Sequence, residues 1–261
     1  MAELVLPELD PTSDRPVFKQ IADHLREAIS QGILAPGVKV PSESQLMAHY
    51  GVARMTLRNA LQILQSEGLT VAEHGRGVFV RSRPPVRRLA SDRFARRHRE
   101  RGKAAFIAET EDAGGKPSVD SIQINETKAS ADVIKRLGLA KGDRVIVRSR
   151  RYLIDGHPVE TAVSYIPSEI ARGTQIAQPD SGPGGIYARL EEMGYRLDHF
   201  EEEIRCRMPL REEAKALRLA PGVPVFQLVR TAFAEDGKAV EICDTVMSSD
   251  VYVLMYQLPA R

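Results

Sequence analysis

The chain has 261 residues, of which 43% are hydrophobic and 28% charged, and its formal net charge is +2. This length suits two domains with a core each, and the composition is typical of globular proteins, which excludes a largely disordered or fibrous chain. The sequence holds no apolar run long enough to cross a membrane and no signal-peptide pattern, so we expect a cytoplasmic protein with no membrane partner.

The N-terminal part begins with a stretch that has no clear hydrophobic period. Residues 1–14 contain two prolines, and we expect them to form a flexible arm. Apolar residues at helical spacing then predict a helix over Val17–Gln31, which Gly32 ends. This helix is the first element of a domain that we expect to cover residues 15–82.

Two more helices follow close together. Ser42 and Gln45 form a capping box, which predicts a helix that ends near Gly51. A third helix is expected from about Ala53 to about Glu67. The order of elements is therefore helix, short turn, helix.

The third helix has two different faces. Its apolar face is made by Leu57, Ala60, Leu61 and Leu64. Its other face presents Met55, Arg58, Asn59 and Gln62, with Arg54 at the edge. A short helix-turn-helix with an exposed polar second helix fits the major groove of B-DNA, where an arginine can bond O6 and N7 of guanine together. An ordinary solvated face is the alternative, but the tight turn before the helix and a hairpin after it favour contact with DNA.

The hairpin is predicted by two short extended runs, residues 69–72 and 78–80, around a glycine-rich loop. Its tip has the sequence His74-Gly75-Arg76-Gly77. Glycine permits a tip thin enough to enter a groove, and an arginine there suits the strong negative potential of a narrow minor groove. A plain solvated turn is the alternative.

These residues carry a resemblance to a known family. The segment from about Pro16 to Val80 resembles the winged helix-turn-helix of GntR-type transcriptional regulators, through the motifs at Gly32–Glu43, Gly51–Leu61 and Gly75–Val80. The resemblance implies that Arg54, Thr56 and Arg58 contact double-stranded operator DNA and that Gly75 and Arg76 enter the minor groove. The candidate DNA-binding residues are Ser42, Ser44, Arg54, Met55, Thr56, Arg58, Asn59, His74, Gly75, Arg76 and Gly77.

Two positions depart from the family pattern. Ser44 stands where the family usually has a basic residue, and Ala53 replaces a usual Ser or Thr that could cap the helix. The operator sequence therefore does not transfer from the family.

A basic segment separates two nearly neutral blocks. Residues 82–103 carry nine Lys or Arg against two Asp or Glu. We expect residues 83–103 to form a basic linker, which could include a helix in its second half, and such a patch is compatible with a phosphate-rich partner. We hypothesise that Arg83, Arg87 and Arg88 add phosphate contacts.

The second domain, expected over residues 104–261, contains an internal repeat. Leu137–Glu160 and Leu217–Glu241 each read as a helix end, a glycine turn, a strand, an Asp-Gly hairpin turn and a second strand. A helical stretch precedes each copy, at residues 130–137 and 210–217. Two such units imply an α+β domain built on an antiparallel sheet with flanking helices.

This domain resembles the UTRA effector-binding domain of the HutC branch of the GntR family, through the residues from Arg148 to Pro167 and from Glu235 to Tyr252. The resemblance implies a fold like that of chorismate lyase and a small-molecule effector. Tyr152 and Ala162 stand where sugar-phosphate-sensing members have an arginine and a glutamate, so we expect an effector other than a phosphosugar.

The alternation of side chains along a strand places Arg148, Arg150 and Tyr152 on one face and Arg151 on the other. Surface arginines and core tyrosines are the alternative to a pocket. The candidate effector-binding residues are Arg148, Arg150, Tyr152, Tyr165, Glu241 and Tyr252.

No catalytic or metal-binding pattern stands out. The acidic run Asp198–Arg205 is typical of a solvated strand or helix face, Gly182–Gly185 lacks the residues of a phosphate loop, and Cys206 and Cys243 are expected to be reduced thiols. We expect a regulator with no cofactor. An enzyme of chorismate-lyase-like fold and a ligand-independent repressor are the alternatives.

The expected fold is α+β with two domains, a winged helix-turn-helix followed by an antiparallel sheet with flanking helices. A single reading helix buries too little surface for tight specific binding. We therefore expect a homodimer on a palindromic site, associated with the nucleoid, in which a small molecule controls operator affinity.

Overall fold

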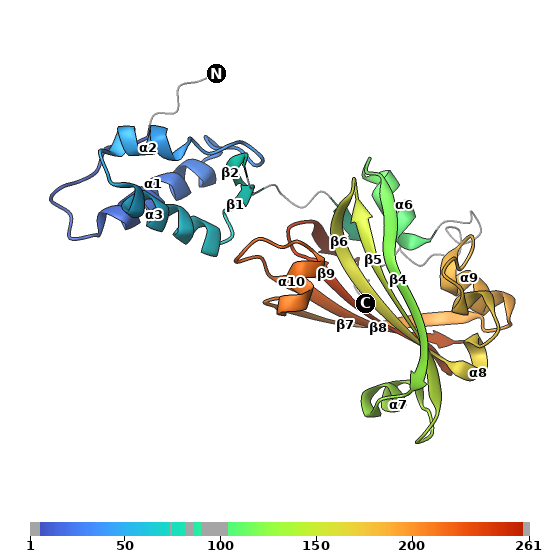
Figure 1. The fold of residues 1–261 in the computed structure, drawn as a ribbon. Coiled ribbons are helices and arrows are strands. Elements are labelled where there is room, and N and C mark those ends of the chain that lie inside the picture. The colour runs from blue at the N-terminus through green and yellow to red at the C-terminus, as the bar shows by residue number, and fades with distance from the viewer. Residues whose placement is uncertain (1–5, 74, 82–85, 90–103, 258–261) are drawn as a thin grey trace. The chain divides into compact units, whose positions relative to one another are not determined.

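The computed structural model describes residues 6–73, 75–81, 86–89 and 104–257. The chain divides into two compact units, Met1–Arg83 with Leu219–Val223, and Pro84–Arg218 with Pro224–Arg261. Each unit has hydrophobic clusters of its own. The predicted α+β class with two domains is confirmed (Figure 1).

The first unit contains three helices and a hairpin. Its elements are α1 (Val17–Ser30), α2 (Glu43–Tyr50), α3 (Arg54–Ser66), β1 (Thr70–Glu73) and β2 (Gly77–Val80). The helices enclose a core that includes Leu25, Leu57 and Leu64, and β1 pairs with β2 in antiparallel register. The predicted capping box is present, because Ser42 Oγ accepts from Gln45 N while Gln45 Oε1 accepts from Ser42 N at 2.9 Å.

The start of this unit differs from the predicted flexible arm. Leu6 is only 6% exposed and packs in the same core as the helices. The buried Gln20 donates to the carbonyls of Asp10 and Arg15, and its own oxygen accepts from Asp10 N at 3.0 Å. Residues 6–14 therefore contact the helices through Leu6 and through the backbone N–H and C=O of Asp10.

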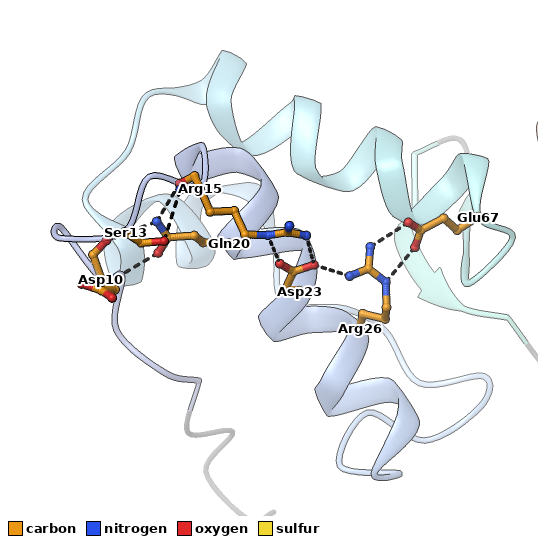
Figure 2. A network of polar contacts seen from close by, with 7 residues as sticks. All are labelled: Asp10, Ser13, Arg15, Gln20, Asp23, Arg26 and Glu67. Atoms are coloured by element: carbon orange, nitrogen blue, oxygen red, sulfur yellow. Dashed lines mark hydrogen bonds and ion pairs between the residues drawn. The ribbon is translucent and has the colours of Figure 1, made fainter.

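A chain of charged side chains ties α1 to the end of α3. Asp23 accepts from Arg15 and from Arg26, and Arg26 also donates to both carboxylate oxygens of Glu67, at 3.0 and 2.7 Å (Figure 2). Glu67 follows α3 directly. The position of α3 against α1 is thus set by ion pairs as well as by apolar packing.

The second unit is built on a six-stranded antiparallel sheet of order β4-β5-β6-β9-β8-β7. Its strands are β4 (Pro117–Lys128), β5 (Arg144–Ile154), β6 (His157–Pro167), β7 (Leu197–Arg207), β8 (Val225–Ala234) and β9 (Ala239–Ser248). Its helices are α6 (Ala105–Asp112), α7 (Ala131–Leu137), α8 (Ser168–Ala171), η1 (Gln175–Ala177), α9 (Gly185–Glu192) and α10 (Arg211–Ala216). A separate parallel pair joins β3 (Val86–Leu89) to β10 (Tyr252–Met255).

The internal repeat is longer than the sequence indicated. The series α6, β4, α7, β5, β6 recurs as α9, β7, α10, β8, β9, and each element begins 80 to 82 residues after its counterpart. The two copies meet at the pair β6·β9, and their other strands extend outward in mirrored order, as Figure 1 shows. The sheet is therefore one duplicated unit with approximate two-fold symmetry.

The segment between the predicted domains is only partly described. Residues 86–89 form β3 within the second unit, so this part of the predicted linker 83–103 belongs to a folded sheet. The predicted phosphate contact of Arg88 is wrong, because its guanidinium is 1% exposed and bonds Glu202 and Met247. Arg83, the side chain of Arg87 and the helix expected in the second half of the linker lie outside the described residues.

Candidate DNA-reading surface and effector pocket

The exposed face of α3 carries the predicted reading residues. Arg54, Met55, Arg58 and Asn59 are exposed and Thr56 is half-buried. Leu57, Ala60 and Leu61 bury the opposite face. Ser42 and Ser44, at the start of α2, are exposed as well. Ala53 provides no side-chain cap for α3, so the first backbone N–H groups of this helix have no hydroxyl partner there.

Glu43 holds the two arginines of α3. Its Oε1 lies 3.3 Å from Arg58 Nε and its Oε2 lies 3.5 Å from Arg54 Nε. The side chain of Arg54 is 65% exposed and that of Arg58 is 55% exposed. Each contact with Glu43 is made by Nε, which leaves the Nη groups available to a partner. The sequence did not indicate this role of Glu43, because the contact depends on how α2 and α3 pack together.

The wing presents Arg76 at its tip. Its side chain is exposed, pairs with Glu73 and lies 5.4 Å from the centre of the Phe79 ring. Gly75 and Gly77 both have positive φ, and a Cβ on Gly77 would lie 2.6 Å from Lys39 Cε. Lys39 thus lies beside the wing, an additional basic group that no motif indicated. His74 lies outside the described residues.

A cavity of about 470 Å³ lies in the second unit. The strands β5, β6, β8 and β9 provide one wall, and residues at the starts of α6 and α9 provide another. Its apolar lining comes from Phe106, Ile107, Val119, Ile122 and Ile186. This volume is in the usual range for small-molecule sites.

The predicted arginines line this cavity, but other groups already hold their side chains. Arg148 donates to the carbonyls of Ile176 and Pro179, at 3.2 and 2.5 Å, and so fixes the loop before α9. Burial lowers the pKa of Arg148. Arg150 donates to Tyr152 Oη at 2.6 Å and to Ser164 Oγ at 2.9 Å. Arg151 does not line the cavity and pairs with Asp120, as the alternation of side chains along β5 predicts.

Two predicted pocket residues lie outside the cavity. Tyr165 packs beside Val133 and Leu137 of α7, on the other face of the sheet. The strand period explains this, because Tyr165 is an odd number of residues from Glu160 and Ala162, which do line the cavity. Tyr252 is buried on β10 next to Met247 and Phe106. Glu241 lines the cavity as expected.

Sequence reasoning missed Glu160 and Arg230. The repeat could have found them, since Arg230 follows Arg150 by 80 residues and Glu241 follows Glu160 by 81. All four side chains line the cavity. Each copy of the repeat thus contributes one arginine of this pair, half-buried for Arg150 and buried for Arg230, and one buried glutamate.

A buried ion-pair cluster lies next to the cavity. Glu202 Oε1 accepts from Arg230 Nε and from Arg88 Nη2, both at 2.9 Å, and Tyr256 Oη donates to Glu202 Oε2 at 3.1 Å. Arg230 Nη1 lies 3.4 Å from Tyr187 Oη. Burial raises the pKa of Tyr187 well above its usual value, so this hydroxyl stays protonated. The cluster connects β3 with the wall of the cavity.

Comparison with known proteins identifies the family. Residues 18–80 match the model of bacterial regulatory proteins of the gntR family, and residues 112–253 match the UTRA domain. An HTH-type transcriptional regulator of Streptomyces coelicolor is 34% identical over 92% of each chain. The chain belongs to the GntR family of transcriptional regulators.

Further relatives agree with this assignment. The HTH-type transcriptional repressor NagR of Bacillus subtilis is 26% identical to this GntR-family regulator over 96% of this chain and 98% of its own. The crystal structure of a GntR-family regulator matches with a TM-score of 0.63 at 29% identity, over 95% of this chain and 99% of that one. PhnF from Mycobacterium smegmatis shares the fold, with a TM-score of 0.59 at 21% identity over 94% and 100% of the two chains.

The family assignment confirms the predicted function class. The GntR-family regulator binds DNA through its N-terminal unit and a small-molecule effector through its UTRA domain, and the effector controls DNA binding. No helix among the described residues has the length and apolar character to cross a membrane. Residues 6–73, 75–81, 86–89 and 104–257 contain no group of three side chains suited to a metal ion.

Proposed function

We propose that this regulator is a homodimeric, cytoplasmic repressor that reads its operator with α3 and the wing. Arg54 and Arg58 would contact the major groove and Arg76 the minor groove. Several relatives are named as repressors, including the mannosyl-D-glycerate system repressor MngR of Escherichia coli at 24% identity. The effector would release the operator by binding better to the arrangement that does not bind DNA.

One observation carries this proposal. The exposed face of α3 combines two guanidinium groups, held one helical turn apart by Glu43, with the exposed Met55 and Asn59. A guanidinium with free Nη groups can bond guanine O6 and N7 or clamp a phosphate. Because Glu43 restricts the side chains before binding, less conformational entropy is lost on contact with DNA.

The reading role of α3 can be tested on a selected operator. The full chain would first be used to select duplexes from a random library, and binding would then be measured by fluorescence anisotropy at fixed salt. We expect Arg58→Ala to weaken binding by about 1–3 kcal/mol and to relax the preference at one base pair. The matched control is Arg196→Ala, since Arg196 is also exposed and pairs with a glutamate but lies in the second unit. Equal affinity of the Arg58→Ala variant and the wild type would contradict the proposal.

The dimer and the direction of regulation need their own measurements. Sedimentation should give a dimer of the 28.9 kDa chain, and the selected site should be palindromic. A compound that stabilises the protein should lower operator affinity. The same compound should be recovered unchanged after incubation, whereas its conversion would favour an enzyme.

A further inference from the structure

Two carboxylate oxygens in the cavity accept no hydrogen bond from the described residues. Glu160 and Glu241 line the cavity and are each 2% exposed. The Oε2 atom of each has no hydrogen-bond partner in the described part of the chain. Leaving such an acceptor unsatisfied is costly, and an unsatisfied buried group in a native structure calls for an explanation, such as a functional role or a bound molecule. Both oxygens therefore call for donors from a bound molecule.

The two carboxylates come from opposite ends of the cavity. Glu160 on β6 pairs with Met247 on β9, and Glu241 precedes Met247 by six residues on the same strand. At about 3.3 Å per residue, the two Cα atoms lie roughly 20 Å apart along the strands. Glu160 is opposite Tyr152 in the β5·β6 pair. The ring centre of Tyr152 is 4.6 Å from that of Phe106, which also lines the cavity. The approximate two-fold symmetry of the repeat thus places one acceptor at each end.

The arginines of the cavity do not satisfy these acceptors. Arg148 donates to backbone carbonyls, and Arg150 donates to Tyr152 and Ser164. Arg230 bonds Glu202 and Tyr187. The lining side chains of the described residues also balance in charge, since three arginines face Glu160, Glu241 and Asp180. These contacts favour a ligand that donates hydrogen bonds over one that brings further negative charge.

We propose that the effector is an elongated small molecule that donates hydrogen bonds from both of its ends, one to Glu160 and one to Glu241. Its donors are hydroxyl or ammonium groups, and its middle part lies against the apolar residues of α6 and α9. This inference rests on the proposed function and specifies the chemistry of its effector.

The first test needs no ligand. Thermal unfolding of the ligand-free full chain would be compared for Glu160→Gln, Glu241→Gln and Glu202→Gln. Glu202 is the control, a half-buried glutamate of the same sheet whose oxygens both have partners. We expect the melting temperature to fall for Glu202→Gln and to stay within about 2–4 °C of the wild type, or to rise, for the other two. A fall in all three variants would show that Glu160 and Glu241 are structural, which would overturn the proposal.

The second test uses probes that separate the two kinds of donor. Maltotriose offers hydroxyl groups, 1,12-diaminododecane offers ammonium groups at both ends, and dodecanedioate has similar length without donors. We expect stabilisation by the hydroxyl or the ammonium probes and a loss of about 10- to 100-fold in affinity in Glu160→Ala and in Glu241→Ala. The exposed Glu169→Ala is the control. Stabilisation by dodecanedioate alone, by no probe, or to the same degree in both alanine variants as in the wild type would overturn the proposal.

The result also distinguishes this inference from the proposed function. Intact operator binding by the wild type together with failure of both acceptor tests rejects only the chemistry of the effector. Loss of sequence-specific DNA binding in the wild type rejects the function itself.

Discussion

Replacement of Glu202 by glutamine should strongly destabilise the second unit. Glu202 Oε1 accepts from two buried guanidinium groups, Arg88 at 1% and Arg230 at 6% exposure, and Oε2 accepts from Tyr256. Glutamine has nearly the same shape, but it has no charge and only one acceptor oxygen. Two buried positive charges would then lose their shared counterion.

The size of the effect follows from this geometry. Removal of one partner from a buried ion pair costs about 3–5 kcal/mol, because the remaining charge stays buried without compensation. For a unit of this size, that cost corresponds to a fall in melting temperature of roughly 6–20 °C. The effect of Glu212→Gln, an exposed residue of α10, should be within about 0.5 kcal/mol.

The measurement is urea unfolding of the full chain followed by far-ultraviolet circular dichroism, since the chain has no tryptophan. The two units can unfold in separate transitions, and only the transition of the second unit should move. A loss below about 1 kcal/mol for Glu202→Gln would refute the reasoning, because it would mean that the arginines do not depend on this carboxylate.

The same residue makes stability depend on pH. Burial alone would raise the pKa of Glu202, but Arg230, Arg88 and hydrogen bonds outweigh it and hold the pKa below 4.5. The contribution of the carboxylate is therefore complete above the unfolded value and is lost as the pH falls through the lower folded value. Unfolding of the glutamine variant should depend less on pH in this acidic range.

Four further predictions concern the first unit and use thermal or urea unfolding of the full chain. Gly77→Ala should cost about 1–3 kcal/mol, because φ is +121° and the new Cβ would approach Lys39. Gln20→Ala should cost about 1–3 kcal/mol by releasing the polar groups of residues 10–15. Ser42→Ala should cost about 1 kcal/mol through the lost cap, and a neutral result would mean that the capping box contributes nothing. The hydrogen bond from Arg15 lowers the pKa of Asp23 despite burial. Asp23→Asn should therefore reduce the free energy of unfolding above pH 3.8, the ordinary pKa, and should make this free energy depend less on pH below it.

The DNA-reading helix could be predicted because local signals define it. The capping box at Ser42 and the 3.6-residue spacing of Leu57, Leu61 and Leu64 depend only on neighbours in the sequence. The same helical spacing predicts that Arg54 and Arg58 lie away from the apolar face. The contact of both with Glu43 could not be predicted in this way, because it depends on the angle between α2 and α3.

The strands at the sheet edges were harder to predict. Both β4 and β7 are largely exposed and polar, so they lack the alternation of a half-buried strand. The acidic run in β7 was interpreted only as a solvated face. It contains Glu202, whose neighbour on β8 is Arg230, and this pairing depends on a register that local patterns do not contain.

The pocket illustrates the same limit. The alternation along β5 placed Arg148, Arg150 and Tyr152 on one face, and these residues line the cavity. The face of Tyr165 depends on the register between β5 and β6, where a bulge interrupts the count. Arg88 was assigned to an exposed linker because its charge was read without its tertiary partner.

The junction of the two repeats has a consequence for the integrity of the domain. The two copies meet only at the central pair β6·β9 of this sheet, so β6 in one half and β9 in the other each need the other half as a neighbour. A cut in the loop of residues 179–184 would leave two fragments, each with a long open edge that only a second fragment could cover. A single copy, expressed alone, would pair this open edge most readily with the same edge of a second molecule of that copy.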